Sequence, residues 1–111
     1  MSDILRLKAG ETLCEKGGSS DEMYILRSGE VKVMDGDREI EVLKSIAVIG
    51  EVSFIEKIPR QNTVIANMPC TLMVISRESF DEVFSTMPDW YMALYTSVLS
   101  RLKNMGYGDI V

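Results

Sequence analysis

Between Thr12 and Ile75 the sequence alternates short runs of β-forming residues with turn-forming residues at regular intervals. Strands that are this short and this evenly spaced are typical of a β-sandwich or a β-barrel. The turn Asp35-Gly36-Asp37 predicts a tight hairpin, because a mirror-image turn needs positive φ angles that glycine tolerates. The predicted strands cover residues 12–15, 23–26, 31–34, 40–43, 47–49, 63–67 and 72–75.

After Ile75 the apolar residues change to helical spacing, and Ser76 is a suitable N-cap for a first helix. Pro88 stops that helix and suits the first turn of the next one. The second helix carries one apolar stripe, formed by Tyr91, Leu94, Tyr95, Val98 and Leu102, and is expected to end near Gly106. The lead from Ser2 to Leu7 could be helical or extended. The fold class is therefore mainly β with C-terminal helices.

A chain of 111 residues predicts one domain, residues 1–111, with the β part at about 7–75 and the helices at about 77–105. The formal charge is −5 and the basic residues are scattered, so direct nucleic-acid binding is not expected. No apolar run approaches the length of a membrane span, and we expect a cytoplasmic location.

The chain contains no histidine, which removes the commonest general base and a common metal ligand. We find no paired acids tied to a nucleophile, so we expect neither an enzyme nor a metal site. Cys14 and Cys70 are isolated and are expected to be buried and reduced.

Five short motifs occur in a specific order along the chain, namely residues 7–13, 17–21, 23–31, the pair Gly50-Glu51, and residues 59–64 (PRQNTV). This order resembles the cyclic-nucleotide-binding domain family, which includes cAMP-dependent kinase regulatory subunits, catabolite-activator-type regulators and nucleotide-gated channels. The resemblance runs from about Leu7 to Leu102. It implies a double-stranded β-helix, or jelly-roll barrel, that binds a cyclic nucleotide.

In that family the segment between the Gly-Glu pair and the arginine is a phosphate-binding cassette. The resemblance implies that Gly50 admits the sugar, that Glu51 accepts from the ribose 2′-hydroxyl, and that the Ser53 amide and Arg60 hold the phosphate. The complete expected binding set is Gly50, Glu51, Val52, Ser53, Arg60, Gln61 and Asn62. A short helix starting at Glu51 would direct free amides and its positive dipole end toward such an anion.

The residues alone leave an alternative open, in which Glu51 and Arg60 form a surface ion pair and bind no ligand. The sequence also departs from the family pattern, with Ile46 in place of a glycine and Ile49 in place of a phenylalanine before the Gly-Glu pair. Gln61 and Asn62 follow the arginine where small residues are usual. Because the family uses a small hydroxyl residue there to recognise cGMP, Gln61 favours cAMP.

We therefore expect a sensor that binds a cyclic nucleotide, with cAMP favoured over cGMP, and signals through its C-terminal helix to an effector protein or domain outside this chain. Candidate lids over the base are Trp90, Tyr91, Tyr95, Val98, Leu102, Met105 and Tyr107. One alternative is a ligand-free interaction module that forms a homodimer through the last helix. Another is a site for a different small anion.

Overall fold

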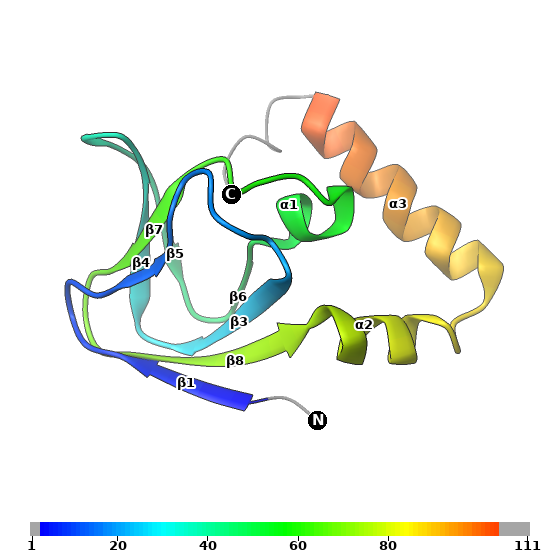
Figure 1. Cartoon of the computed structure of the whole chain (residues 1–111), viewed down its shortest axis with the longest axis horizontal. Coiled ribbons are helices and arrows are strands. Elements are labelled where there is room, and N and C mark those ends of the chain that lie inside the picture. The colour runs from blue at the N-terminus through cyan, green and yellow to red at the C-terminus, as the bar shows by residue number, and fades with distance from the viewer. Residues whose placement is uncertain (1–2, 105–111) are drawn as a thin grey trace.

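The computed structural model describes residues 3–104, which form β-strands with one short helix between the sixth and seventh strands and two further helices after the last strand (Figure 1). Each predicted strand is present within a few residues of its expected position. The strands are β1 Asp3–Leu7, β2 Thr12–Cys14, β3 Glu22–Ser28, β4 Glu30–Asp35, β5 Arg38–Lys44, β6 Ala47–Ile49, β7 Thr63–Ala66 and β8 Cys70–Ser76. Residues 3–7 of the lead, whose conformation the sequence left open, are extended and form β1 along β8.

The described strands form two antiparallel sheets, in the orders β1-β8-β3-β6 and β2-β7-β4-β5. This is the arrangement of a double-sheet jelly roll. The expectation of a barrel is wrong in one respect, because no pairing among residues 3–104 joins the two sheets into a closed barrel. Except for the β4–β5 hairpin, consecutive strands lie in different sheets and do not hydrogen-bond with each other.

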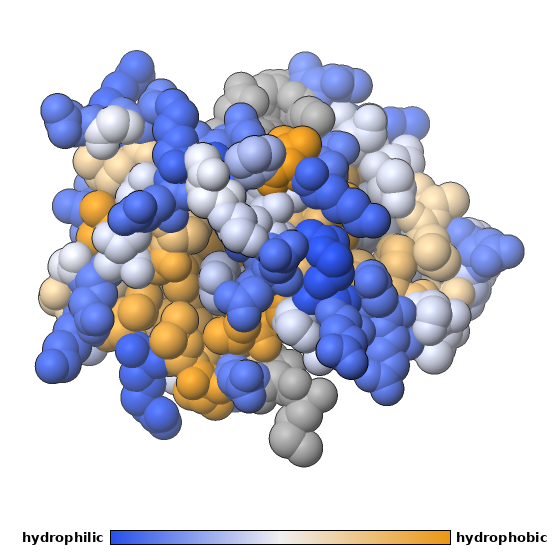
Figure 2. Space-filling view, viewed as in Figure 1, coloured by the Kyte–Doolittle hydropathy of each residue, from blue (hydrophilic) through white to orange (hydrophobic). Residues whose placement is uncertain are grey.

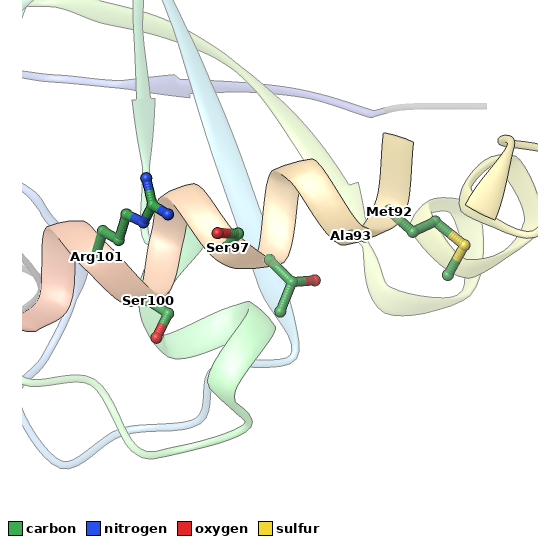
Figure 3. A pocket seen from close by; sticks show the side chains of 6 residues that line it. Met92, Ala93, Ser97, Ser100 and Arg101 are labelled. Atoms are coloured by element: carbon green, nitrogen blue, oxygen red, sulfur yellow. The ribbon is translucent and has the colours of Figure 1, made fainter. Parts of the chain in front are cut away.

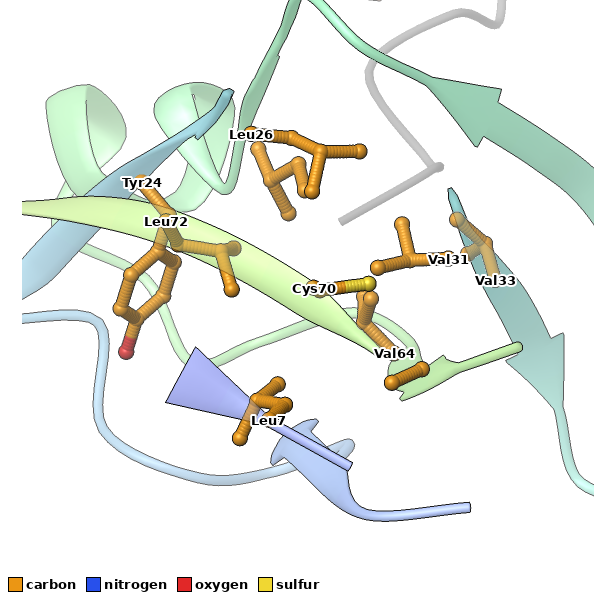
Figure 4. Packing of buried hydrophobic residues seen from close by; sticks show 10 residues of the cluster. Leu7, Tyr24, Leu26, Val31, Val33, Val64, Cys70 and Leu72 are labelled. Carbon is orange, nitrogen blue, oxygen red and sulfur yellow. The ribbon is translucent and has the colours of Figure 1, made fainter. Parts of the chain in front are cut away.

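The core lies between the two sheets and is built from the inward side chains of each strand (Figure 4). In β4, Val31 and Val33 are fully buried, which is the period-two pattern of a strand with one covered face. Leu26, Leu72 and Val64 meet them from β3, β8 and β7 and are equally buried. Cys70 lies in this core as a free thiol, as expected, while Cys14 is free and half-buried.

The helices are α1 Glu51–Glu56, α2 Arg77–Phe84 and α3 Asp89–Asn104. The predicted cap is confirmed, since the Ser76 hydroxyl accepts a hydrogen bond from the Ser79 amide at 3.1 Å. Pro88 directly precedes α3, as expected of a residue that suits a first helical turn. The expected end of this helix near Gly106 lies outside the described residues. Within residues 3–104, no helix combines the length and the apolar character that crossing a membrane requires.

Candidate functional site

Arg60 lies in the segment between α1 and β7, and the turn after β2 holds its backbone in place. The amide of Gly17 donates to the Arg60 carbonyl at 2.8 Å, and the Arg60 amide donates to the Gly18 carbonyl at 3.1 Å. The side chain points inward and is only 2% exposed. A turn some 40 residues earlier in the chain, which the sequence identified only as a loop, therefore positions the central arginine.

The guanidinium of Arg60 donates to three oxygen atoms. Nη1 contacts the Gly50 carbonyl and the Ser53 hydroxyl, each at 2.8 Å, and Nη2 contacts the Glu22 carbonyl of β3. The aromatic ring of Tyr24 lies 5.7 Å from the guanidinium carbon. All three acceptors are neutral, and Nε is buried without a hydrogen-bond partner among the described residues.

Gly50 is required at its position for two separate reasons. Its φ of 82° lies in the left-handed region, where a side chain is strained. In addition, a Cβ at this position would collide with Nη1 of Arg60. The absence of a side chain at Gly50 therefore allows the guanidinium to sit directly against the start of α1.

The first turn of α1 presents backbone amides that the helix itself does not use. The first helical hydrogen bond runs from the Phe54 amide to the Gly50 carbonyl at 3.1 Å, so the Ser53 amide precedes it. Val52, Ser53 and Phe54 are buried, which fixes this short helix against the sheets. The short helix that the sequence predicted at Glu51 is confirmed.

Glu51 and Arg60 do not form the surface ion pair that the sequence left open. Arg60 is buried, and no salt bridge among the described residues joins it to a carboxylate. Burial raises the pKa of the Glu51 carboxyl, and its own backbone amide and the Arg60 charge offset only part of this effect. Burial likewise raises the pKa of Tyr24 to about 12, with Glu22 adding to the rise and Arg60 opposing it.

The two amide residues after the arginine differ in environment. The Gln61 side chain donates from Nε2 to the Pro59 carbonyl at 2.7 Å, so its donor is engaged by nearby backbone. Asn62 is 4% exposed and belongs to the interior. Among the departures before the Gly-Glu pair, Ile46 is 81% exposed whereas Ile49 is fully buried in the core.

The structure thus brings Gly50, Ser53 and Arg60 into contact, with Glu51 beside them. It places Val52 and Asn62 in the interior and leaves Gln61 bonded to its own loop. The sequence analysis missed Glu22 and Tyr24, and no local signal marks a residue that acts through its carbonyl or its ring.

Arg77 is another residue that the sequence analysis missed. Its Nη2 donates to the Ser20 and Phe54 carbonyls, each at 2.9 Å, and its guanidinium lies 4.2 Å from the Phe54 ring centre. A basic residue at a helix N-terminus opposes the helix dipole, and this mismatch is a signal that could have identified it. Arg77 ties the start of α2 to the end of α1.

A chain of aromatic rings leads from α1 to α3. Phe54 meets Phe80 edge-on at 5.2 Å, Phe80 stacks on Phe84 at 4.8 Å, and Phe84 meets Tyr95 at 6.0 Å between ring centres. Burial raises the pKa of Tyr95, and the Glu51 charge adds to this rise. The helix α3 therefore lies close to the candidate site, in agreement with its position beside α1 in Figure 1.

The predicted apolar stripe of α3 is largely exposed. Leu94 is 55% and Val98 48% exposed, and with Tyr91 and Tyr95 they line an apolar hollow of about 210 Å³. The opposite side of the helix carries mostly small or polar residues, shown in Figure 3: Met92, Ala93, Ser97, Ser100 and Arg101. Of the proposed lid residues, Met105 and Tyr107 and the side chain of Leu102 lie outside the described residues.

Comparison with known proteins identifies the class of this domain. A family model described as the cyclic nucleotide-binding domain matches residues 4–87, most of the chain. The chain therefore belongs to the cyclic-nucleotide-binding domain family, and the resemblance noted from its motifs is confirmed.

Individual relatives show how this domain is used elsewhere. A cGMP-dependent protein kinase of Toxoplasma gondii is 35% identical over 84 residues, which cover 76% of this chain and 8% of the kinase. A cAMP-dependent protein kinase regulatory subunit of Aspergillus fumigatus is 26% identical over 89 residues, 78% of this chain and 22% of the subunit. An EAL enzyme, Bd1971, in a half-site-occupied form has a TM-score of 0.79 at 20% identity, covering 96% of this chain and 99% of that one. The chain thus corresponds to a small part of the kinase-related proteins.

Proposed function

We propose that this chain is a regulatory sensor domain that binds a cyclic nucleotide at Arg60 and signals through α3. The observation that carries the proposal is the environment of Arg60. A guanidinium that is 2% exposed contacts only neutral oxygens, and no described carboxylate forms a salt bridge with it. A buried charge without a counterion is costly, and one phosphodiester anion would neutralise it.

In this proposal the residues around Arg60 have separate roles. Arg60 pairs with the cyclic phosphate, the Ser53 amide donates to it, and Gly50 leaves room for the sugar. The Glu51 carboxylate accepts from the ribose 2′-hydroxyl. Val52, Gln61 and Asn62 complete the set, with Val52 and Asn62 supporting it from the interior because both are at least nine-tenths buried.

We favour cAMP over cGMP as the ligand. The residue after the arginine is Gln61, and its amide nitrogen already donates to the Pro59 carbonyl at 2.7 Å. The Gln61 amide is therefore not positioned to contact a guanine base in the way that a small hydroxyl residue would. The names of the relatives include both a cGMP-dependent and a cAMP-dependent kinase, so both nucleotides belong in the test.

The signal would pass from α1 to α3 through the contacts already described. A ligand on the first turn of α1 acts on the helix whose Phe54 touches both Arg77 and Phe80. Phe84 and Tyr95 continue the contact into α3. A change in α3 would follow only if the ligand binds two positions of these helices unequally. The effector that reads α3 is a protein or domain outside this chain.

A second candidate is a ligand-free interaction module. It is favoured by the fact that Arg60 already has three internal acceptors, so the guanidinium is held even without a ligand. The exposed apolar stripe of α3 would then serve a homodimer. A third option retains Arg60 as the site of a different small anion.

Calorimetric titration of the wild-type chain with cAMP, cGMP and inorganic phosphate tests the proposal. We expect binding of cAMP, weaker binding of cGMP, and a melting temperature that rises with ligand, because a ligand of the folded state stabilises it by mass action. Binding of phosphate without nucleotide would support the small-anion site. An unchanged melting temperature in millimolar cAMP and cGMP would instead support the ligand-free module.

A further inference from the structure

The outer face of the sheet β1-β8-β3-β6 carries an unbroken apolar row that crosses all four strands. Ile4 of β1 pairs with Met73 of β8, Met73 pairs with Ile25 of β3, and Ile25 pairs with Val48 of β6. Leu72, the neighbour of Met73, is fully buried in the core. Because successive side chains of a strand point to opposite faces, the row faces away from the core.

This row is accessible to solvent. Ile4 and Val48, at its two ends, are each 46% exposed, and the two central residues are half-buried. Figure 2 shows hydrophobic side chains gathered over the region where β1 and β8 lie in Figure 1. Residues on the solvent-exposed face of an antiparallel sheet are normally polar, so an apolar row on that face indicates a contact surface.

Basic residues lie on one side of the row. Thr71 lies two residues along β8 from Met73. It pairs with Arg6 of β1 and lies opposite the bulge of β3 that contains Arg27. Both arginines are exposed, and neither is in a salt bridge with another described residue. Although the chain has a net charge of −5, these two arginines without salt-bridge partners among residues 3–104 make this end of the sheet locally positive.

An apolar hollow with an acidic residue lies on the other side of the row. Ile75 lies two residues from Met73 in the opposite direction along β8, and it pairs with Met23 of β3. These two residues, together with Phe80 and Glu82 of α2, line a hollow of about 520 Å³. The arginines and the hollow are therefore equally spaced from the apolar row, one on each side of it.

We propose that a second copy of this chain docks face to face on this sheet. A two-fold axis that runs along the apolar row would pack the row against itself. The same rotation reverses the strand direction, so that Arg6 and Arg27 of each copy would lie over the hollow and Glu82 of the other. An axis along the strands would instead place arginines over arginines. The surface is thus complementary to itself in one orientation, as a two-fold interface requires.

Sedimentation equilibrium between about 1 and 500 µM protein tests this interface. We expect a monomer–dimer equilibrium for the wild type. The variant Val48→Glu should raise the dimer dissociation constant at least about tenfold, because it places two carboxylates against each other on the axis. Val42→Glu is a matched control on β5 of the other sheet, where Val42 is 38% exposed, and it should leave the dissociation constant unchanged. Circular dichroism melting verifies that both variants fold.

Charge exchange tests the orientation. Arg6→Glu combined with Arg27→Glu should weaken the dimer, and Glu82→Arg alone should weaken it as well. The three substitutions together should restore a dissociation constant near that of the wild type, because the facing charges are then opposite again.

Three results would overturn the inference. The first is a wild type that stays monomeric over the whole concentration range. The second is a dimer that resists Val48→Glu but dissociates with Leu94→Glu, which would place the contact on α3. The third is a dimer that tightens when only the arginines are replaced, which would mean that arginines face arginines.

Discussion

Replacing Arg60 with lysine separates the charge at the candidate site from its geometry. Lysine keeps the positive charge, so the attraction for an anion and the cost of burying the charge both remain. A single ammonium group cannot replace the planar guanidinium, in which Nη1 contacts Gly50 and Ser53 while Nη2 contacts Glu22. Loss of one charge-assisted hydrogen bond costs about 1.5–3 kcal/mol, so we expect roughly 10- to 150-fold weaker cAMP binding.

The assay is titration calorimetry with cAMP on the wild type, Arg60→Lys, and Arg38→Lys as a control at an exposed arginine of β5. Circular dichroism melting without ligand reports separately how much the internal contacts of Arg60 stabilise the fold. If the wild type and Arg60→Lys bind cAMP within about twofold of each other, the anion does not lie at this guanidinium and the reasoning is refuted.

Three further changes test the same site. Because burial raises the folded-state pKa of Glu51, its ionised form destabilises the fold, and stability should fall as pH rises from the unfolded pKa of 4.5 through the raised pKa. The variant Glu51→Gln should therefore have a higher melting temperature than the wild type at pH 7 but not near pH 4, and it should bind cAMP more weakly. Equal melting temperatures at pH 7 would contradict this. Gly50→Ala should lose about 1–3 kcal/mol of stability in urea unfolding, with Gly36→Ala, at φ 61° but in open space, losing less. Arg77→Ala should lose about 1–3 kcal/mol through the Ser20 and Phe54 carbonyls, and a loss no larger than that of Arg38→Ala would count against the link between α1 and α2.

Much of the fold could be predicted from the sequence because its signals are local. Period-two runs and an Asp-Gly turn define strands such as β4 and β5, and Ser76 and Pro88 mark helix ends through their own backbone chemistry. The order of the motifs was enough to indicate the family. The lead that became β1 carried no such signal, since only pairing with β8 decides that it is extended.

The sequence by itself determined that an arginine would follow a short helix after a Gly-Glu pair. Only the tertiary structure decided what that arginine touches, because its partners are far away in the chain. Glu22 is 38 residues from Arg60, and the turn at Gly17 and Gly18 lies farther still. Contacts with α1, β3 and the turn after β2, and not the nine-residue spacing to Glu51, set the environment of the guanidinium, since contacts between distant segments exist only once the chain has folded.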